Sequence, residues 1–149
     1  MKRKIFVIAA VSAMFWACDP ACDIECFIKN GTNTKVTVVS PNFNVEIASG
    51  NESVINGDYG DLGGASRGEC EHLMKLKLSD SVAFMTESGD TVIFHKTDTT
   101  GLSPYNFKSA VYSYEDKTAK FPKGDPNSPF YGKLTYKITD EIFSNNNAD

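Results

Sequence analysis

Short runs of alternating apolar and polar residues, separated by glycine- and proline-containing turns, constrain the fold of this chain more than any other feature. The pattern is clearest in residues 80–86 and 91–96, which flank the turn 87–90 and predict a β-hairpin. Other strand-like runs follow the same period of two. They cover residues 25–29, 35–40, 43–48, 54–55, 108–114 and 132–138.

Four further segments carry predictions for the parts of the chain between and after these strands. Residues 30–33 are rich in types that tolerate positive φ, so the strands on either side are expected to pair as a first hairpin. Residues 57–68 contain five glycines and predict a long loop. Residues 73–78 favour a strand, with one helical turn as the alternative. Residues 139–143 predict a capped terminal turn.

Seven or eight short strands without a convincing long amphipathic helix predict an all-β domain. The expected architecture is an antiparallel β-sandwich of the immunoglobulin-like kind. A small β-barrel is the alternative, because both architectures alternate inward and outward residues and differ only in closure. The domain is expected to span residues 24–143, followed by a polar tail at 144–149.

The first 17 residues have the pattern of an export signal. Three basic residues precede an apolar run, 5–16, that is too short to span a bilayer. The small residue Ala17 precedes Cys18, so a lipoprotein signal peptidase would cut between them and leave Cys18 joined to lipid. Ordinary signal peptidase is the less favoured alternative because Phe15 occupies a position where that enzyme needs a small residue. An uncleaved anchor is disfavoured by the short apolar run.

Removal of the signal makes the chain strongly acidic. Without its three basic residues, 12 Lys and Arg face 19 Asp and Glu, a formal charge of −7. This balance disfavours nucleic acid and anionic lipid as partners, since both require clustered cations. Residues 18–23 are expected to be the lipidated cysteine and a tether to the membrane. The expected location is the bacterial outer membrane, with the periplasmic and surface-facing sides both open.

Several short motifs resemble those of one bacterial family. They are Ile28-Lys29-Asn30-Gly31-Thr32, Asp80-Ser81-Val82 with a Gly-Asp hairpin, and Tyr136-Lys137-Ile138-Thr139-Asp140-Glu141. On these motifs the chain resembles small lipoproteins of unknown function from Bacteroides-type bacteria. The resemblance covers most of the mature chain and implies an envelope location without implying an activity.

The same resemblance implies possible O-glycosylation within Asp-Ser/Thr triads. The candidate acceptors are Ser81, Thr91 and Thr99, with Thr99 expected to be the most accessible. The alternative interpretation is preferred: Asp, Ser and Thr commonly begin strands and turns, so the triads need no modification to explain them.

Three cysteines follow Cys18, namely Cys22, Cys26 and Cys70. In an oxidising compartment they predict one disulfide and one odd thiol, with Cys70 paired to Cys22 or Cys26. The alternative is a zinc site formed by the three cysteines and His72, since thiolates and imidazole suit tetrahedral zinc. The spacing is not typical of such sites, so no metal is expected.

No catalytic motif is found, and the chain has only two histidines. We therefore expect no enzyme and no cofactor, but a non-enzymatic binding or accessory module with a protein or carbohydrate ligand. Zinc-binding or carbohydrate-binding envelope proteins are the alternatives, and an envelope hydrolase is disfavoured. The glycine-rich loop 57–68 and the aromatic rings of Tyr105 and Tyr131 are the candidate ligand contacts.

Overall fold

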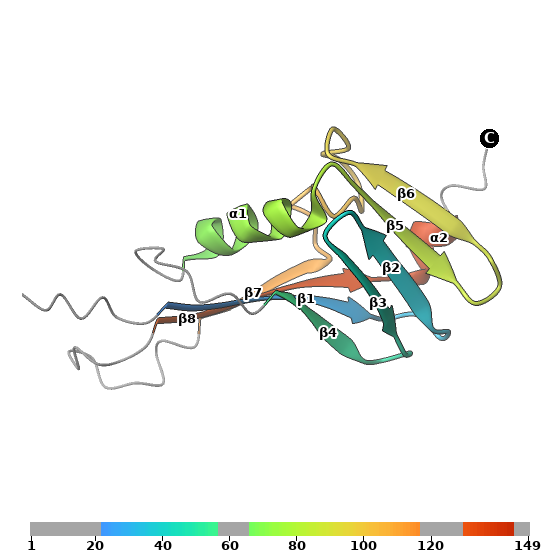
Figure 1. Cartoon of the computed structure of the whole chain (residues 1–149), viewed down its shortest axis with the longest axis horizontal. Helices are drawn as coiled ribbons and strands as arrows, with labels where there is room; N and C mark the ends of the chain where they lie inside the picture. Colours follow the sequence, from blue (N-terminus) through green and yellow to red (C-terminus); the bar gives the residue numbers. More distant parts are fainter. Residues whose placement is uncertain (1–21, 57–65, 117–129, 145–149) are drawn as a thin grey trace, which may run out of the picture.

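The computed structural model describes residues 22–56, 66–116 and 130–144, which form eight strands and two helices (Figure 1). The first sheet has the order β4-β1-β8-β7 and comprises β1 (Cys22–Asn30), β4 (Glu52–Asn56), β7 (Tyr112–Asp116) and β8 (Phe130–Ile138). The second has the order β3-β2-β5-β6 and comprises β2 (Val36–Ser40), β3 (Phe43–Ile47), β5 (Ser81–Thr86) and β6 (Thr91–His95). The helices are α1 (Arg67–Leu78) and α2 (Asp140–Ser144). The described part of the chain is thus mostly strand, as expected for an all-β fold.

The pairing of β1 with β8 is parallel and runs from Cys22 opposite Phe130 to Asn30 opposite Ile138. Every other strand pair among the described residues is antiparallel. The expectation of a wholly antiparallel fold is therefore wrong at the centre of the first sheet. The alternation of side chains along a strand is the same in a parallel and an antiparallel pair. The path of the chain between β1 and β8 alone sets the relative direction of these two strands.

The predicted hairpin at residues 80–96 is confirmed, with Ser81 opposite His95 and Met85 opposite Thr91. The predicted first hairpin is wrong, because β1 and β2 belong to different sheets. The chain crosses from the first sheet to the second after Asn30 and crosses back between β3 and β4. Turn-forming residues at 30–33 make this crossing instead of closing a hairpin.

Asn30 explains why the chain changes sheets at this point. Its side chain is fully buried and its amide donates to the carbonyls of Thr34 at 2.7 Å and Ile47 at 2.9 Å. Its Oδ1 accepts from the backbone N–H and the hydroxyl of Thr32, at 2.9 and 2.8 Å. The next residue must be glycine, since a Cβ on Gly31 would lie 2.7 Å from the carbonyl oxygen of Ile138. This polar network fixes the turn between the sheets.

Helix α1 replaces the strand expected at residues 73–78. Ser66 and Glu69 form a capping box: Ser66 Oγ accepts from the Glu69 N–H at 3.3 Å and Glu69 Oε2 accepts from the Ser66 N–H at 2.7 Å. The buried residues Cys70, Met74 and Leu78 recur every four positions and form one face of the helix. The apolar residues of this segment fit a period of two as well as a helical face, and the capping signal decides between them.

Helix α1 and the second sheet lie over the same side of the first sheet (Figure 1). The core between the sheets is aromatic: the ring of Phe84 on β5 stacks on Tyr136 of β8 at 5.8 Å, and Tyr112 of β7 lies 5.1 Å from Tyr136. Strand β7 begins only at Tyr112, four residues later than expected, because 106–112 form turns in which Asn106 and Ser109 carbonyls accept backbone bonds.

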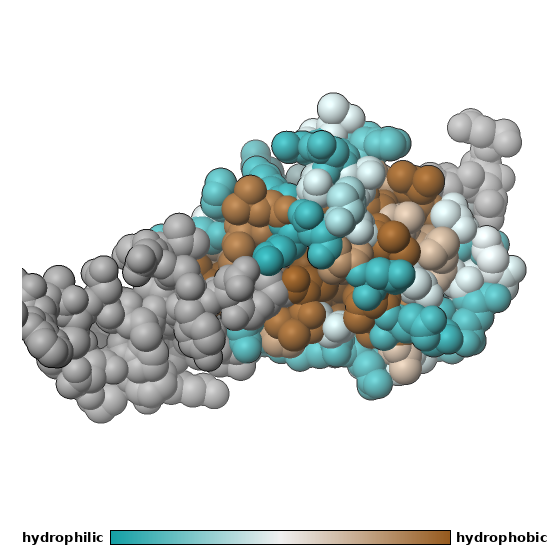
Figure 2. Space-filling view, viewed as in Figure 1, coloured by the Kyte–Doolittle hydropathy of each residue, from teal (hydrophilic) through white to brown (hydrophobic). Residues whose placement is uncertain are grey.

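On the face shown in Figure 2, hydrophobic residues are interleaved with hydrophilic ones. Neither helix among the described residues has the length and apolarity needed to cross a membrane. The terminal turn expected at residues 139–143 is confirmed as α2, which buries Ile142 and Phe143.

Candidate functional site

A groove of about 520 Å³ lies between α1 and the loop that follows β6. Helix α1 contributes Arg67, Glu71 and Lys75, and the loop contributes Thr99, Asn106 and Lys108. The helical residues are spaced four apart, so they form one continuous line along the helix surface. The capping box sets the start of the helix and thereby places this line against the loop.

Arg67 and Lys75 connect helix α1 to the loop wall of the groove. The Nε of Arg67 donates to Oε1 of Glu71 at 2.9 Å, and its Nη2 donates to the carbonyl of Phe107 at 2.7 Å. The Nζ of Lys75 lies 5.1 Å from the centre of the Phe107 ring, within cation–π range. Lys108 is exposed. Three cations and one carboxylate therefore surround the groove of a chain whose formal net charge is −4.

Tyr105 lines this groove, as expected for a ligand-contact candidate, but the residue is only 4% exposed. Its hydroxyl donates to the carbonyl of Leu78 at the end of α1, at 3.3 Å. Burial, followed by the charges of Asp80 and Asp98, raises the pKa of Tyr105 to about 12. The ring thus ties the loop to the helix and offers little surface for stacking. Tyr131, the other candidate, lies in β8, and its side chain is outside the described part of the structure.

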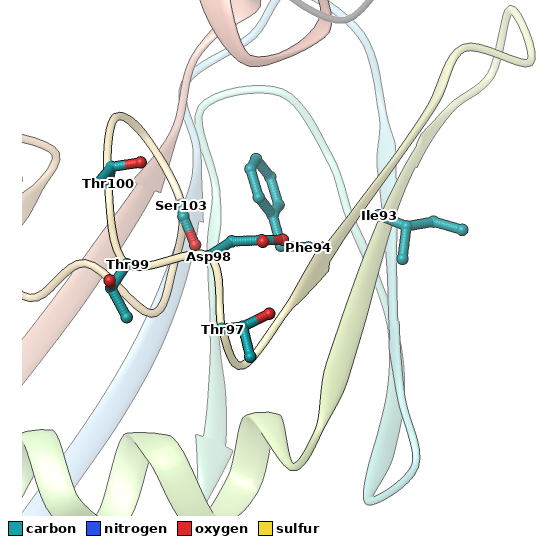
Figure 3. A pocket seen from close by; sticks show the side chains of 7 residues that line it. All are labelled: Ile93, Phe94, Thr97, Asp98, Thr99, Thr100 and Ser103. Carbon is teal, nitrogen blue, oxygen red and sulfur yellow. The ribbon is translucent and has the colours of Figure 1, made fainter.

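A second hollow, of about 370 Å³, is lined by residues of β6 and of the same loop, and it shares Thr99 with the groove (Figure 3). Hydroxyl groups of Thr97, Thr100 and Ser103 line it together with Asp98. Oδ2 of Asp98 accepts from the backbone N–H of His95 at 2.7 Å, which closes the turn after β6. Figure 3 shows the Asp98 side chain extending from the loop toward Phe94 of β6.

The three candidate glycosylation sites differ in exposure. Ser81 is half-buried in β5, which is paired on both sides. Thr91 is exposed at the start of β6, where its hydroxyl donates to the carbonyl of Gly89 at 3.3 Å. Thr99 is exposed in the loop. The structure therefore leaves Thr91 and Thr99 accessible and Ser81 much less so.

The structure brings two of the candidate cysteines together. Cys26 of β1 and Cys70 of α1 are both fully buried, and the Cys26 thiol donates to the carbonyl of Cys70 at 3.5 Å. Both are thiols, with no disulfide between them. Burial raises the pKa of Cys26 to about 12 and that of Cys70 to about 11.

The candidate zinc ligands are not assembled by the described residues. His72 is exposed and lies two residues after the buried Cys70 on α1, a rotation of about 200° around the helix. Within the described ranges, no group of three or more Cys, His, Asp or Glu side chains could hold a metal ion. Cys22 begins β1, but its side chain lies outside the described residues.

Some sequence-based candidates cannot be placed. Cys18 and residues 57–65 lie outside the described ranges. Conversely, sequence reasoning missed Arg67, Lys75 and Lys108 as a group. The Ser66-x-x-Glu69 pattern was the signal that could have revealed the helix, and with it the line of charged residues. Lys108 lies beyond any local signal, because folding alone brings it to the helix.

Comparison of the chain with protein-family models, with curated proteins and with solved structures finds no significant match in any of the three.

Proposed function

We propose that this chain is a lipid-anchored protein of the bacterial outer membrane whose single domain is a non-enzymatic binding module. The observation that carries the binding role is the cationic groove between α1 and the loop after β6, lined by Arg67, Lys75 and Lys108. A resemblance to small Bacteroides-type lipoproteins supports the envelope location. The membrane would be one partner, through the lipid, and the ligand of the groove the other.

The proposed architecture is a β-sandwich with immunoglobulin-like packing of its two sheets. Its support is the pairing of the strands into two separate four-stranded sheets and the stacking of Phe84 on Tyr136 across them, at 11° between ring planes. The parallel pair of β1 and β8 and the helix over one end depart from an all-antiparallel sandwich.

Lipidation of Cys18 would place the domain close to the bilayer. Strand β1 begins at Cys22, so only residues 19–21 separate the proposed lipid attachment from the first strand. A chain of that length reaches at most about 14 Å. The tether is therefore shorter than the sequence pattern indicates, and the domain would have little freedom to move away from the membrane.

Charge defines the ligand class of the groove. Phe107 is 7% exposed and its ring is approached by Lys75, and Tyr105 is 4% exposed, so neither offers an open stacking face. The available chemistry is that of Arg67, Lys75 and Lys108, which suits a carboxylate or phosphate group. A carbohydrate ligand is a second candidate, because the neighbouring hollow presents several hydroxyls and Asp98, which can bond to sugar hydroxyls.

The membrane location is tested by the intact mass of the protein extracted from membranes of its host. A diacylglycerol-modified chain beginning at Cys18 is expected, and the Cys18→Ala variant should lose the lipid and leave the membrane fraction. An unmodified chain beginning at another residue would refute the anchor without affecting the binding proposal.

The binding role is tested by nuclear magnetic resonance titration of the chain from residue 18 with citrate as a multivalent anionic probe and glucose as a neutral one. Citrate is expected to shift the amide signals of Arg67, Asn106 and Lys108. The Lys108→Ala variant should weaken binding at least about threefold, as expected for the loss of one charge contact. Lys96→Ala, which removes an exposed cation paired with Asp80 outside the groove, is the matched control. Equal losses in both variants would show nonspecific charge attraction and refute the groove.

A further inference from the structure

Cys26 and Cys70 are separated by 44 positions in sequence, yet they meet in the core where α1 crosses β1. Both side chains are inaccessible to solvent, and the sulfur of Cys26 contacts the backbone of Cys70 at 3.5 Å. Burial, and after it the charge of Cys70, raises the pKa of the Cys26 thiol.

Position along β1 separates Cys26 from Cys22. The two residues are four positions apart on one strand, which corresponds to about 13 Å. Cys26 is the residue that contacts the backbone of Cys70, and bridged cysteines need Cα atoms within about 7 Å, so the structure favours Cys26 over Cys22 as the partner of Cys70.

We infer that Cys26 and Cys70, which are thiols in this structure, are oxidised to the single disulfide of the mature protein, and that Cys22 remains the odd thiol. This inference concerns a modification and goes beyond the proposed ligand binding. It resolves a choice that spacing in the sequence leaves open, because Cys22 and Cys26 are equivalent partners until β1 is placed under α1.

The reaction is a thiol–disulfide exchange with an external disulfide, such as oxidised glutathione or the disulfide of an envelope oxidoreductase. The thiolate of one cysteine attacks a sulfur of the donor and forms a mixed disulfide, and one donor thiolate leaves. The second cysteine thiolate then displaces the other donor sulfur and forms the Cys26–Cys70 bond. The two cysteines together lose two protons and two electrons, and the donor disulfide is reduced to two thiols.

Burial determines when this exchange takes place. The thiolate is the attacking species, and the raised pKa values of both cysteines keep the thiolate scarce in the folded protein. A donor molecule also cannot reach side chains that are fully buried. The bond therefore forms while α1 docks on β1, before the core closes, and folded reduced protein resists oxidation.

The bond would fasten one wall of the groove. Helix α1 carries Arg67, Glu71 and Lys75, and its noncovalent ties to the loop include the Arg67–Phe107 and Tyr105–Leu78 hydrogen bonds. A covalent link at Cys70 adds a connection to β1, one of the two inner strands of the first sheet. The link stabilises the folded state by restricting the unfolded chain over a loop of 44 positions.

The test uses the chain from residue 18 with Cys18→Ala and Cys22→Ala, which retains only Cys26 and Cys70. The denatured, reduced protein is refolded with a mixture of reduced and oxidised glutathione, and its mass and the alkylation of its thiols in denaturant are measured. The expected product is lighter by two hydrogen atoms and is not alkylated until reduced. Its thermal midpoint should exceed that of the reduced form by at least about 5 °C. Two alkylated thiols after refolding would overturn the inference.

The chain that retains Cys22 supplies the competing outcome. Digestion with trypsin and a protease specific for acidic residues cuts between Cys22 and Cys26 at Asp23 or Glu25. A peptide joining Cys26 to Cys70 supports the inference, and a peptide joining Cys22 to either residue overturns it. The mass test reads out the bond even if Cys26→Ala or Cys70→Ala fails to fold. Protein isolated from the cell with Cys26 and Cys70 both reduced would also overturn the inference, even where refolding with glutathione forms the bond.

Discussion

The side-chain amide of Asn30, at the end of β1, donates a hydrogen bond of 2.9 Å to the carbonyl of Ile47, at the end of β3. One residue of the first sheet is thereby tied to the second. Asn30 is fully buried, and the same amide also donates to the carbonyl of Thr34 at 2.7 Å. The network around Asn30 is thus the polar link between the two sheets.

Substitution Asn30→Ala is expected to lower the free energy of unfolding by about 2–4 kcal/mol, because several buried polar groups lose their partner. Urea denaturation monitored by far-ultraviolet circular dichroism measures the change in the free energy of unfolding. Asn33→Ala, at an exposed position of the same turn, is the control and should change stability by less than about 0.5 kcal/mol. Equal effects of the two substitutions would contradict a structural role for the Asn30 network.

Two glycine-to-alanine substitutions are expected to change the free energy of unfolding in opposite directions. A Cβ at Gly31 would lie 2.5 Å from Cε of Lys137 and 2.7 Å from the backbone oxygen of Ile138, so Gly31→Ala should destabilise the protein by about 1–3 kcal/mol. A Cβ at Gly68, in the first turn of α1, would meet nothing closer than 3.9 Å. Gly68→Ala should therefore stabilise by about 0.5–1 kcal/mol through helix propensity. Thermal denaturation of both variants checks the signs, and a destabilised Gly68→Ala would refute the helix.

Removal of the capping side chain in Ser66→Ala is expected to cost about 1 kcal/mol, because the Glu69 N–H loses its acceptor at the N-terminus of α1. Hydrogen exchange of the amides in the first turn of α1 should also become faster. Ser113→Ala, at an exposed position in β7, provides the comparison and should leave both quantities nearly unchanged. A strand at this position would be insensitive to the cap, so an unchanged exchange rate in Ser66→Ala would argue against the helix.

Stability is expected to fall at alkaline pH. Burial raises the pKa of Tyr105 from 10.0 to about 12 and also raises the pKa values of Tyr112 and Tyr136. Above pH 10 the unfolded chain releases these phenolic protons while the folded chain retains them. The contribution of these hydroxyls to the free energy of unfolding is therefore fully present below pH 10 and decreases as pH rises from 10 through about 12.

Urea denaturation at a series of pH values, with tyrosinate absorbance recorded in parallel, measures this dependence. Tyr105→Phe removes one of the titrating groups and should make the decrease between pH 10 and about 12 less steep. A constant free energy of unfolding over this range would show that the three hydroxyls titrate normally in the folded state.

Local sequence patterns are sufficient to predict the positions of several elements. The hairpin of β5 and β6, the strand β3, the C-terminal strand β8 and the short helix α2 are where the residues predict them. In each case the period of the side chains and the adjacent turn or cap residues lie within a few positions of one another, so nothing distant has to be known. The strand-rich character of the domain is predicted by the same local patterns.

The segment at residues 66–78 shows where local patterns conflict. The apolar side chains of Met74, Leu76 and Leu78 alternate like a strand, while Cys70, Met74 and Leu78 follow a helix. Leu76, which the strand pattern would bury with its neighbours, is 56% exposed. The helix is stabilised by packing of the face that contains Cys70 against β1 and β8. In the sequence, only the capping box indicates that this segment is a helix.

The sequence by itself determined most strand positions, the position of the last helix and the charge of the chain, because these depend on residues close together. Only the tertiary structure decided that β1 and β8 run parallel, that Asn30 links two sheets, that Cys26 meets Cys70, and that Lys108 joins Arg67 and Lys75 around one groove. These relationships join residues distant in the chain. Their free energy comes from burying a shared core and satisfying buried polar groups, which no local pattern records.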